Sequence, residues 1–521
     1  VGLMTHGPKS MEPFQQIPFG QPRLCHFETI VAAPAEPWLG SMSTYAGQAM
    51  TTTSHQELVS ALISRWPESH PQPSLERIAL LCEMLGEPQR AFPIIQITGT
   101  NGKGSTAIMI ESLLRTLGLR TGRFSSPHLV DVTERICIDG QPISAEIFDE
   151  TWQQIAPMVE MVDAQLIGGV PLTFFEVITT MAYAAFADAP VDVAIIEVGM
   201  GGRWDATSVA DADVAVITPV DLDHMHLLGS TVAEIAAEKA GIIKANSTAV
   251  FAGQNPEAAK VLSQRCVELG VPMVREGVEF ALLDRASAVG GQLIRVDAAG
   301  GPVGNIFLPL YGSHMAHNAA LAIAAVEAFQ GGRPLAVDVI YEAFGEVRAP
   351  ARLEVVHRDP TVVLDTAHNP HGVRATLTGF REAMGQAPVI AVVAMMADKA
   401  VDEVLGLLSD EVDQIVVTAI PDLPRALSVD ELATRAEDIF GAGRVFTAST
   451  PLAAVQQAIG RTQTTADSDA AAAPVILVIG SVYLAGAVRP WLIEQDAGWD
   501  EQLRFSVPEA DAQLDDEFDQ W

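Results

Sequence analysis

The chain has 521 residues, which is too many for one ordinary hydrophobic core and predicts two domains with additional terminal segments. Apolar residues make up 49% of the chain and charged residues 18%, a composition that is typical of buried parallel sheets and argues against a largely disordered protein. The formal net charge of −34 argues against a nucleic-acid or anionic-membrane partner, because the chain has no excess of cations to displace counterions.

Cysteine usage and hydropathy indicate where the protein works. Cys25, Cys82, Cys137 and Cys266 are widely separated without metal-binding spacing, so we expect reduced core thiols. The sequence lacks an uncharged apolar run of about eighteen residues and a secretory signal pattern. We therefore expect a cytoplasmic protein that binds neither a membrane nor nucleic acid, and that is a monomer.

The first ordered element is expected near His55. Residues 1–50 are rich in Pro, Gly, Ser and Gln without a sustained period, so we interpret them as a disordered extension. From Leu58 onward, apolar residues recur at helical spacing.

A phosphate-binding loop is the strongest motif of the chain. The apolar run Ile94–Ile97 predicts a strand, and it leads into Thr98-Gly-Thr-Asn-Gly-Lys-Gly-Ser105, which the helical pattern of residues 107–117 follows. Glycines let backbone N–H groups approach phosphate oxygens, the helix N-terminus favours an anion, and Lys103 adds a positive charge. This order of strand, loop, lysine and helix predicts nucleotide binding.

The loop differs from the common P-loop after its lysine. Gly104 directly follows Lys103, and the hydroxyl of Ser105 comes one place later than the Mg²⁺-binding hydroxyl of the common motif. We therefore expect the metal to take its ligands from elsewhere in the chain.

Strands and helices then alternate, which predicts a parallel α/β sheet with functional residues at the carboxyl ends of its strands. We assign residues 51–348 to this first, ATP-binding domain. Further strands are expected at 193–198, 214–218 and 249–252, and helices at 174–186, 232–243 and 319–329.

A second α/β series begins after the Pro-containing segment Arg348-Ala-Pro-Ala-Arg352, and we assign it to a Rossmann-like domain of residues 349–505. We expect a low-complexity surface loop at Thr462–Pro474 and a solvated acidic tail at 506–521. Strands are expected at 362–364, 389–393, 415–418 and 475–479.

Two metal-ligand candidates follow predicted strands of the first domain. Glu197 ends a buried apolar strand and precedes glycines, the setting of a carboxylate that binds Mg²⁺, although a buried glutamate bonded to backbone is the alternative. His224, in the segment 221–229, has an imidazole that could bind a divalent metal ion, but a helix-capping or core histidine is an equal alternative.

Lys239 is an unusual charge in an Ala- and Ile-rich helical pattern. A buried lysine has a lowered pKa and a nucleophilic amine that CO₂ can modify. The alternative is a surface lysine that extends its ammonium into water.

A last group of polar residues is expected at the cleft between the two domains. Arg352 lies at the boundary, and Asp365 and His368 end the first strand of the second domain. These side chains have the chemistry to bind phosphate, ribose and an amine substrate. Asn318 starts a helix of the first domain and has the reach to contact a base or phosphate.

Taken together, these motifs resemble the folylpolyglutamate synthase/dihydrofolate synthase family of the Mur ligase superfamily. The resemblance extends from about Leu58 to Leu492. It covers, in family order, TGTNGKGS, SSPHL, ERI, LTFFE, EVGMGGRWDAT, LDHMHLLG, EKAGIIK, HN and LDTAHNPHG. One departure is Ala351, where the family usually has glycine.

The resemblance implies a Mur ligase fold, ATP and Mg²⁺ as cofactors, and a role for each matching residue. ATP phosphates would contact Asn101, Gly102, Lys103, Gly104 and Ser105, and other ATP contacts would come from Asn318, Arg352 and Asp365. Ser126, Glu197 and His224 would hold Mg²⁺, and Lys239 would be carbamylated. The pterin or dihydropteroate pocket would include Thr173, Phe174, Phe175, Glu176, Trp204, Asp205 and Ala206, while His368 and Ser481 would lie near the incoming glutamate.

The implied reaction is the ATP-dependent addition of L-glutamate to a folate, and also to dihydropteroate, through an acyl phosphate. Lys103, Lys239, His368 and Arg352 are its expected catalytic residues. The alternatives are a Mur-type ligase that acts on a UDP-linked sugar acid and a nucleotide-binding regulator without ligase activity. The segments 172–176 and 204–206 favour a pterin, and the intact set Lys103, Glu197, His224 and Lys239 argues against a degenerate site.

Overall fold

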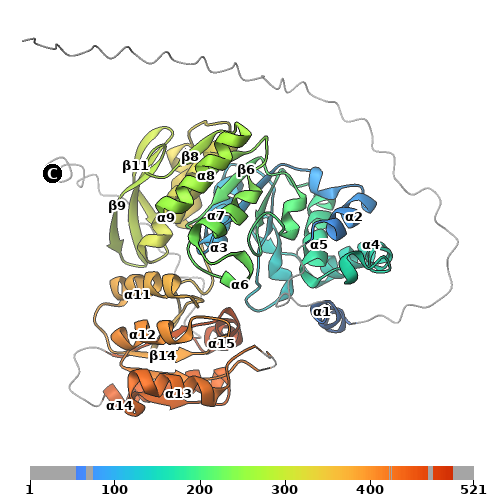
Figure 1. Ribbon diagram of the computed structural model, residues 1–521. Coiled ribbons are helices and arrows are strands. Elements are labelled where there is room, and N and C mark those ends of the chain that lie inside the picture. The colour runs from blue at the N-terminus through green and yellow to red at the C-terminus, as the bar shows by residue number, and fades with distance from the viewer. Residues whose placement is uncertain (1–53, 66–73, 422, 424, 467–472, 497–521) are drawn as a thin grey trace, which may run out of the picture. The chain divides into compact units, whose positions relative to one another are not determined.

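The computed structural model describes residues 54–65, 74–421, 423, 425–466 and 473–496 (Figure 1). The expected N-terminal extension, the acidic tail and Cys25 lie outside these residues. Within them, helices and strands alternate around two mainly parallel sheets, so the predicted α/β fold is confirmed.

The first sheet has eight strands in the order β4-β3-β2-β5-β1-β6-β7-β8. Neighbouring strands from β2 to β8 are parallel, and β3 and β4 add an antiparallel edge. Every residue of β1 and β5 is buried, as expected for parallel strands covered on both faces. The strands are β1 (Ile94–Thr98), β2 (Thr121–Phe124), β3 (Ile136–Ile138), β4 (Gln141–Pro142), β5 (Val193–Glu197), β6 (Val214–Ile217), β7 (Thr248–Phe251) and β8 (Met273–Arg275).

Helices cover both faces of this sheet, and the alternation of side chains along each strand divides the core in two. Ile95 and Ile97 belong to the cluster that includes α3, α9 and α10, whereas Ile94 belongs to the cluster of α2, α4 and α5. The helices α7 and α8 pack against Ala215 and Ile217 of β6. These helices are α1 (His55–Ile63), α2 (Glu76–Met84), α3 (Lys103–Thr116), α4 (Ala145–Asp163), α5 (Phe174–Asp188), α6 (Met225–Leu228), α7 (Val232–Lys239), α8 (Pro256–Leu269), α9 (Ser313–Phe329) and α10 (Val337–Gly345).

A small antiparallel sheet follows β8, and the sequence pattern did not predict it. Its strands, in the order β11-β10-β9, are β9 (Ala281–Ala288), β10 (Gly291–Ala298) and β11 (Gly301–Leu308). Ile294, Val296, Ile306 and Leu308 pack into the same core as α3 and α9. The sheet therefore extends the core of the first domain.

The third sheet belongs to the C-terminal α/β series and has the order β12-β13-β17-β14-β15-β16. The β12–β13 pair is antiparallel and the other pairs are parallel. Its strands are β12 (Glu354–Arg358), β13 (Thr361–Leu364), β14 (Val389–Val393), β15 (Gln414–Val417), β16 (Val445–Thr447) and β17 (Val475–Ile479). Its helices are α11 (Pro370–Met384), α12 (Val401–Glu411), α13 (Val429–Phe440), α14 (Pro451–Ala466) and α15 (Val482–Gln495).

Three expected boundaries need correction. The helix expected at 319–329 begins at Ser313, so Asn318 lies within α9 and not at its start. The helix expected at 232–243 ends at Lys239 and continues as the 3₁₀ turn Ala240–Ile242. The surface loop expected from Thr462 is helical as far as Ala466, because α14 continues through the polar sequence once its buried face, including Ala454 and Ala458, has packed on the sheet.

Two further expectations concern the cysteines and the membrane. Cys82, Cys137 and Cys266 are buried free thiols, as predicted for them. None of the helices in the described part of the chain combines the length and the apolar character that crossing a bilayer requires.

Candidate active site

The phosphate loop connects β1 to α3, and two of its glycines are required by close backbone packing. A Cβ on Gly99 would lie 1.8 Å from the hydroxyl oxygen of Thr218, and a Cβ on Gly102 would lie 2.8 Å from the amide oxygen of Asn318. Gly102 has a φ of +87° and is the N-cap of α3. The Thr218 hydroxyl donates to the Asn101 carbonyl at 2.7 Å, so the residue that follows β6 holds the loop in place.

Two lysines converge on one carbonyl oxygen of this loop. Lys103 Nζ donates to Gly99 O at 3.1 Å and to Thr100 O at 3.3 Å, and Lys239 Nζ, from the end of α7, donates to Gly99 O at 2.8 Å. Burial and, to a smaller extent, the charge of Lys103 lower the pKa of Lys239 to about 7. Burial also lowers the pKa of Lys103, although Glu197 and Asp223 oppose this shift. Lys239 is 4% exposed, which excludes the surface-lysine interpretation.

Glu197 ends β5 next to the loop. Its carboxylate oxygen is 3.4 Å from the position that a Cβ on Gly104 would occupy, and the backbone N–H of Ser126 donates to this carboxylate. Burial raises the pKa of Glu197, while the positive charges of Lys103 and Arg352 oppose the shift. Gly104 of the phosphate loop therefore lies beside a buried carboxylate.

His224 follows β6 in the left-handed region, with a φ of +49°, and is the N-cap of α6. Its Nε2 is 3.8 Å from Asp223 Oδ2. Burial and the nearby charge of Lys399 lower the pKa of His224 to about 4, so its ring is neutral near pH 7. A neutral imidazole is the form that binds a metal ion.

A polar network joins the phosphate loop to the C-terminal domain, and it includes three residues that the sequence interpretation did not assign. Asp223 Oδ1 accepts from Lys399 Nζ at 3.0 Å, and Asp223 Oδ2 accepts from Asn369 Nδ2 at 3.2 Å. Asn369 Nδ2 also donates to Asn101 Oδ1 at 3.1 Å. Burial acts against ionisation of Asp223, but Lys399, His224 and other neighbours hold its pKa well below the usual range.

Of the two residues expected to contact ATP from the domain boundary, Asp365 is buried and Arg352 is partly exposed. Asp365 accepts from Leu353 N at 2.9 Å, from Ala367 N at 2.8 Å and from the Thr376 hydroxyl at 2.9 Å. It therefore fixes the segment that follows Arg352 to the end of β13. Arg352 is close enough that its charge opposes protonation of Lys103.

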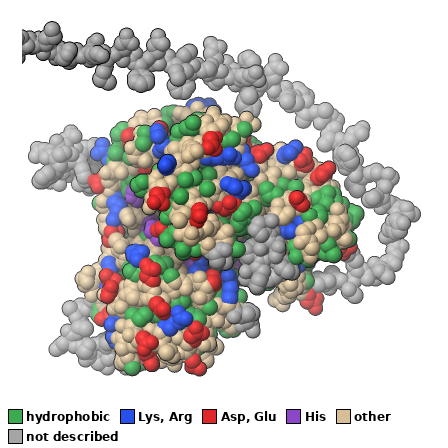
Figure 2. All heavy atoms as spheres, viewed as in Figure 1, with side chains coloured by type: hydrophobic (Ala, Val, Ile, Leu, Met, Phe, Trp, Pro, Cys, Tyr) green, Lys and Arg blue, Asp and Glu red, His purple; other side chains and the backbone are tan. Residues whose placement is uncertain are grey.

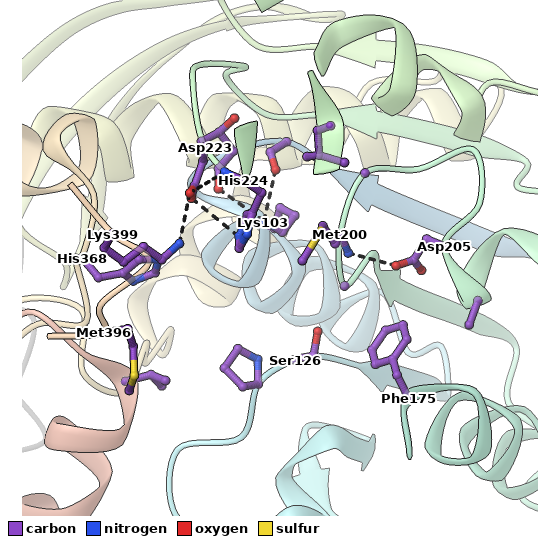
Figure 3. A pocket seen from close by; sticks show the side chains of 18 of the residues that line it. Lys103, Ser126, Phe175, Met200, Asp205, Asp223, His224, His368, Met396 and Lys399 are labelled. Carbon is purple, nitrogen blue, oxygen red and sulfur yellow. Dashed lines mark hydrogen bonds and ion pairs between the residues drawn. The ribbon is translucent and has the colours of Figure 1, made fainter. Parts of the chain in front are cut away.

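One cavity of about 300 Å³ is lined by more than half of the expected site residues (Figure 3). Figure 3 shows Lys103, Asp223, His224 and Lys399 on one side of this cavity, and Phe175 and Asp205 across it. The expected site residues that line it are Lys103, Ser126, Thr173, Phe175, Glu176, Trp204, Asp205, Ala206, His224, Lys239, His368 and Ser481. Those outside its lining are Asn101, Gly102, Gly104, Ser105, Phe174, Glu197, Asn318, Arg352 and Asp365.

The apolar side of the cavity is supported by the start of α5. Thr173 is the N-cap, and its hydroxyl and the carboxylate of Glu176 form a capping box. The Glu176 carboxylate also accepts from Nε of the buried Arg77 at 3.1 Å. Phe174 does not line the cavity: it is buried in the core with the Arg135 guanidinium 5.0 Å from its ring centroid. The helix turns the side chains of Phe174 and Phe175 to different sides, which a run of sequence letters does not show.

The C-terminal domain contributes His368 and Ser481 to the same cavity. His368 Nδ1 lies 2.9 Å from the Thr366 carbonyl oxygen. A carbonyl only accepts, so Nδ1 carries the proton and Nε2 has a free lone pair. Burial and Lys399 lower the pKa of His368 to about 4. Ser481 is the N-cap of α15, and its hydroxyl accepts from Tyr483 N at 3.2 Å.

The residues proposed to bind metal fit Mg²⁺ better than a metal that needs a protein cage. Among the described residues, no group of three or more His, Cys, Asp and Glu side chains is placed to hold a metal ion. Mg²⁺ is commonly bound through one or two carboxylates with substrate phosphates and water. The buried carboxylate of Glu197, which accepts from the Ser126 backbone, and the neutral imidazole of His224 are ligand types compatible with that arrangement.

Two domain families match the chain. The Mur ligase middle domain matches residues 143–326, and the Mur ligase glutamate ligase domain matches residues 351–482. The two matches separate in the segment that contains Arg348 and Pro350.

Curated relatives and solved structures agree with these domains. The dihydrofolate synthase/folylpolyglutamate synthase of Mycobacterium tuberculosis is 45% identical over 452 residues, which cover 82% of this chain and 92% of the relative. The Escherichia coli protein of the same name is 33% identical over 417 residues, 80% of this chain and 90% of the relative. Mycobacterium tuberculosis folylpolyglutamate synthase complexed with ADP has a TM-score of 0.81 and 44% identity, with 84% of this chain and 98% of that chain covered.

Escherichia coli FolC, solved in complex with DHPP and ADP, has a TM-score of 0.73 and 30% identity over 85% of this chain and 99% of that chain. The fold predicted from the sequence is the fold of these proteins. The chain therefore belongs to the dihydrofolate synthase/folylpolyglutamate synthase family of Mur ligases.

Proposed function

We propose that this protein is an ATP-dependent ligase that joins L-glutamate to a folate, and also to dihydropteroate, through an acyl phosphate. The observation that carries the proposal is one cavity whose lining combines a phosphate-loop lysine, an apolar pocket and polar groups of the C-terminal domain. These are the parts needed to bring a nucleotide, an aromatic acid and an amine together. ADP-bound relatives of the same fold support the nucleotide assignment.

In the first step, an oxygen of the acceptor carboxylate attacks the γ-phosphorus of ATP, and ADP leaves. Negative charge spreads over the transferring phosphoryl group, so a cation placed beside the phosphates lowers the barrier. Lys103 lines the cavity at the start of α3, where the backbone N–H groups of the helix N-terminus would also favour an anion. Arg352 adds positive charge nearby.

Ser126, Glu197 and His224 would hold Mg²⁺. The metal would supply charge neutralisation on the ATP phosphates. The chain's own contribution is a buried carboxylate and a neutral imidazole, both kept in place by loops at the carboxyl ends of parallel strands.

Lys239 would act as a carbamate. Its amine is half neutral near pH 7 because its pKa is about 7, and a neutral amine adds to CO₂ with loss of one proton. The product is a carboxylate next to the phosphate loop in place of an ammonium group that would repel a second metal ion. This replacement also removes a like-charge repulsion with Lys103.

In the second step, the amine of glutamate attacks the acyl carbon, an amide bond forms, and phosphate leaves with the oxygen that came from the acceptor carboxylate. His368 presents an unprotonated Nε2 to the cavity, which accepts a hydrogen bond or proton from the incoming amine. Ser481 offers a hydroxyl at the start of α15. An acyl phosphate is hydrolysed by water, so closing the two domains about Arg352 would protect it.

The acceptor would lie against Phe175 and Trp204, which line the same cavity as His368 and Ser481. An aromatic lining suits a flat pterin, and the polar groups beyond it suit the glutamate end. A UDP-linked sugar acid would place a polar sugar and a charged diphosphate against these aromatic rings, which offer them no matching polar groups.

The test is phosphate release with ATP, Mg²⁺ and L-glutamate, with dihydropteroate or tetrahydrofolate as the acceptor. We expect glutamate-dependent turnover with both. Turnover with tetrahydrofolate alone would remove dihydropteroate from the proposal. No turnover with either acceptor would contradict it and favour a Mur-type acceptor or a non-catalytic role.

A further inference from the structure

A second cavity, of about 450 Å³, lies on the other side of the segments that bound the active site. It is formed by the end of α7, the 3₁₀ turn that follows it, the loop after β5, and α8. Its lining is Arg203, Ala237, Ala240, Gly241, Lys244, Val261, Gln264, Arg265 and Glu268.

The charge of this cavity is opposite to that of the protein. It has three cations and one carboxylate, in a chain with a net charge of −34. Figure 2 shows Lys and Arg side chains grouped beside the region of α7 and α8. A cavity lined mainly by cations attracts anions, so this lining indicates an anionic ligand.

Each of the three cations donates a long hydrogen bond to a backbone carbonyl, and carboxylates lie near two of them, Glu238 near Arg203 and Asp211 near Lys244. Arg203 donates to Ala237 O at 3.4 Å, Lys244 to Ser208 O at 3.4 Å, and Arg265 to Ile243 O at 3.3 Å. Such contacts leave N–H groups available for a ligand, because an arginine has five donors and a lysine three.

Arg203 also connects the second cavity to the active site. Its Nε is 3.9 Å from Glu238 Oε2, and the Trp204 side chain donates a hydrogen bond to the same carboxylate. Glu238 Oε1 is buried and has no partner. Trp204 lines the active-site cavity, so the chain of contacts runs from one cavity to the other through one carboxylate.

The backbone between the two cavities is tightly packed. A Cβ on Gly241 would lie 2.3 Å from the Cα of Arg203, and a Cβ on Gly202 would lie 2.8 Å from the carbonyl oxygen of Lys239. Arg203 N donates to Glu238 O at 3.0 Å. A displacement of the Arg203 backbone therefore has little room to be absorbed before it reaches the segment that carries Lys239.

We propose that the second cavity binds a small multivalent oxyanion, a phosphate compound or a polycarboxylate, and that this ligand draws Arg203 away from Glu238 and thereby changes the environment of Trp204. The two ligand sources share the chemistry of clustered anionic oxygens, which guanidinium groups recognise. This inference does not depend on the proposed ligase reaction.

The first experiment measures binding by isothermal titration calorimetry on the full chain at constant ionic strength. Saturating ADP occupies the phosphate loop, and the probes are tripolyphosphate and tri-γ-glutamate in separate titrations. We expect one site for at least one probe, and at least tenfold weaker binding in the double variant Lys244→Gln/Arg265→Gln. Lys260→Gln is the matched control, because Lys260 is an exposed cation of α8 outside the cavity lining.

Each outcome of the titrations decides the question. Binding of tripolyphosphate alone assigns a phosphate-type ligand, and binding of tri-γ-glutamate alone assigns a polycarboxylate. Absence of binding by both probes overturns the site. Equal binding by the double variant and the Lys260→Gln control also overturns it, since the anion would then bind elsewhere.

The second experiment follows the intrinsic fluorescence of tryptophan during the same titrations. We expect a change that saturates with the calorimetric affinity and that Trp204→Phe removes. Binding without this fluorescence change, or a change that persists in Trp204→Phe, would overturn the connection to the active site. Circular dichroism of each variant shows whether it is folded.

Discussion

Burial of Lys239 should make the wild-type protein less stable than a variant without this charge. The pKa of Lys239 falls from 10.5 to about 7, a difference worth about 5 kcal/mol between its two protonation states. Below pH 7 the Lys239 amine is protonated in both states, but in the folded chain its charge is buried, and this burial lowers the free energy of unfolding by the amount just given. The penalty decreases as the pH rises from 7 toward 10.5, where both states become neutral.

Lys239→Met removes the charge and keeps a flexible apolar side chain of similar length. Gly99 O loses the hydrogen bond from Lys239 but still accepts from Lys103 Nζ at 3.1 Å, so no carbonyl is left without a donor. We expect the free energy of unfolding to increase by about 2–5 kcal/mol at pH 6.5 and by about 1 kcal/mol at pH 9.5. The same variant should lose at least 99% of its ligase activity, because no carbamate can form.

The assay is urea unfolding at the two pH values, in buffer free of CO₂ so that the wild-type amine is unmodified. Lys260→Met controls for the general effect of removing a lysine, because Lys260 is exposed. A variant that is less stable than wild type at pH 6.5, or whose stability difference is the same at both pH values, would refute the reasoning.

Four other predictions test the site and its support. Arg77→Met should lower the free energy of unfolding by about 3–5 kcal/mol in urea, because it leaves a buried carboxylate, and Arg77→Met/Glu176→Gln should recover part of the loss; no recovery would contradict the ion-pair account. Gly102→Ala should raise the KM for ATP at least tenfold, because the added Cβ would clash with the Asn318 amide of α9. Gly118 has a similar positive φ but open space around it, so Gly118→Ala should leave the KM unchanged. Equal effects of the two substitutions would show that backbone strain alone is responsible. The free energy of unfolding should fall as the pH decreases from 6.5 to 4, because His368 binds a proton in the unfolded chain but not in the folded chain, where its pKa is about 4. His368→Gln should make this pH dependence shallower. An unchanged slope would contradict the lowered pKa of His368. In addition, Lys239→Ala should lose most activity and short carboxylates such as acetate should restore part of it; full activity in the variant alone would contradict the carbamate.

The hinge segment explains one departure from the family pattern in physical terms. Ala351 is buried and has a φ of +51°, in the left-handed region that favours glycine. An L-residue pays roughly 1–2 kcal/mol there. The backbone N–H of Ala351 donates to the Glu354 carboxylate at 2.8 Å, and this hydrogen bond helps to hold the left-handed conformation.

Local patterns predicted most of the first and third sheets, because parallel strands such as Ile94–Thr98 and Val475–Ile479 are short apolar runs that precede helical periodicity. The small sheet of β9–β11 was missed because half-exposed strands carry charges such as Asp284 and Arg285. Two Gly-Gly pairs, at 290–291 and 300–301, lie between alternating segments and are the signal that would have found it.

The place of Lys103 in the lining of the cavity was predictable, because its motif directly follows a strand. The contacts of Asp223 with Lys399 and Asn369 were not, because they join residues about 150 to 180 positions apart that only the domain arrangement brings together. The second cavity could not be found from the sequence either, since its cations come from three separate segments.

The most direct test of the central claim follows the oxygens of the acceptor during turnover. Folate acceptor labelled with ¹⁸O in both oxygens of its reacting carboxylate would be incubated with ATP, Mg²⁺ and L-glutamate, and the released phosphate analysed by mass spectrometry. An acyl phosphate predicts that one ¹⁸O appears in each phosphate and one remains in the amide. Phosphate without ¹⁸O, formed at the same rate as the amide, would contradict the mechanism.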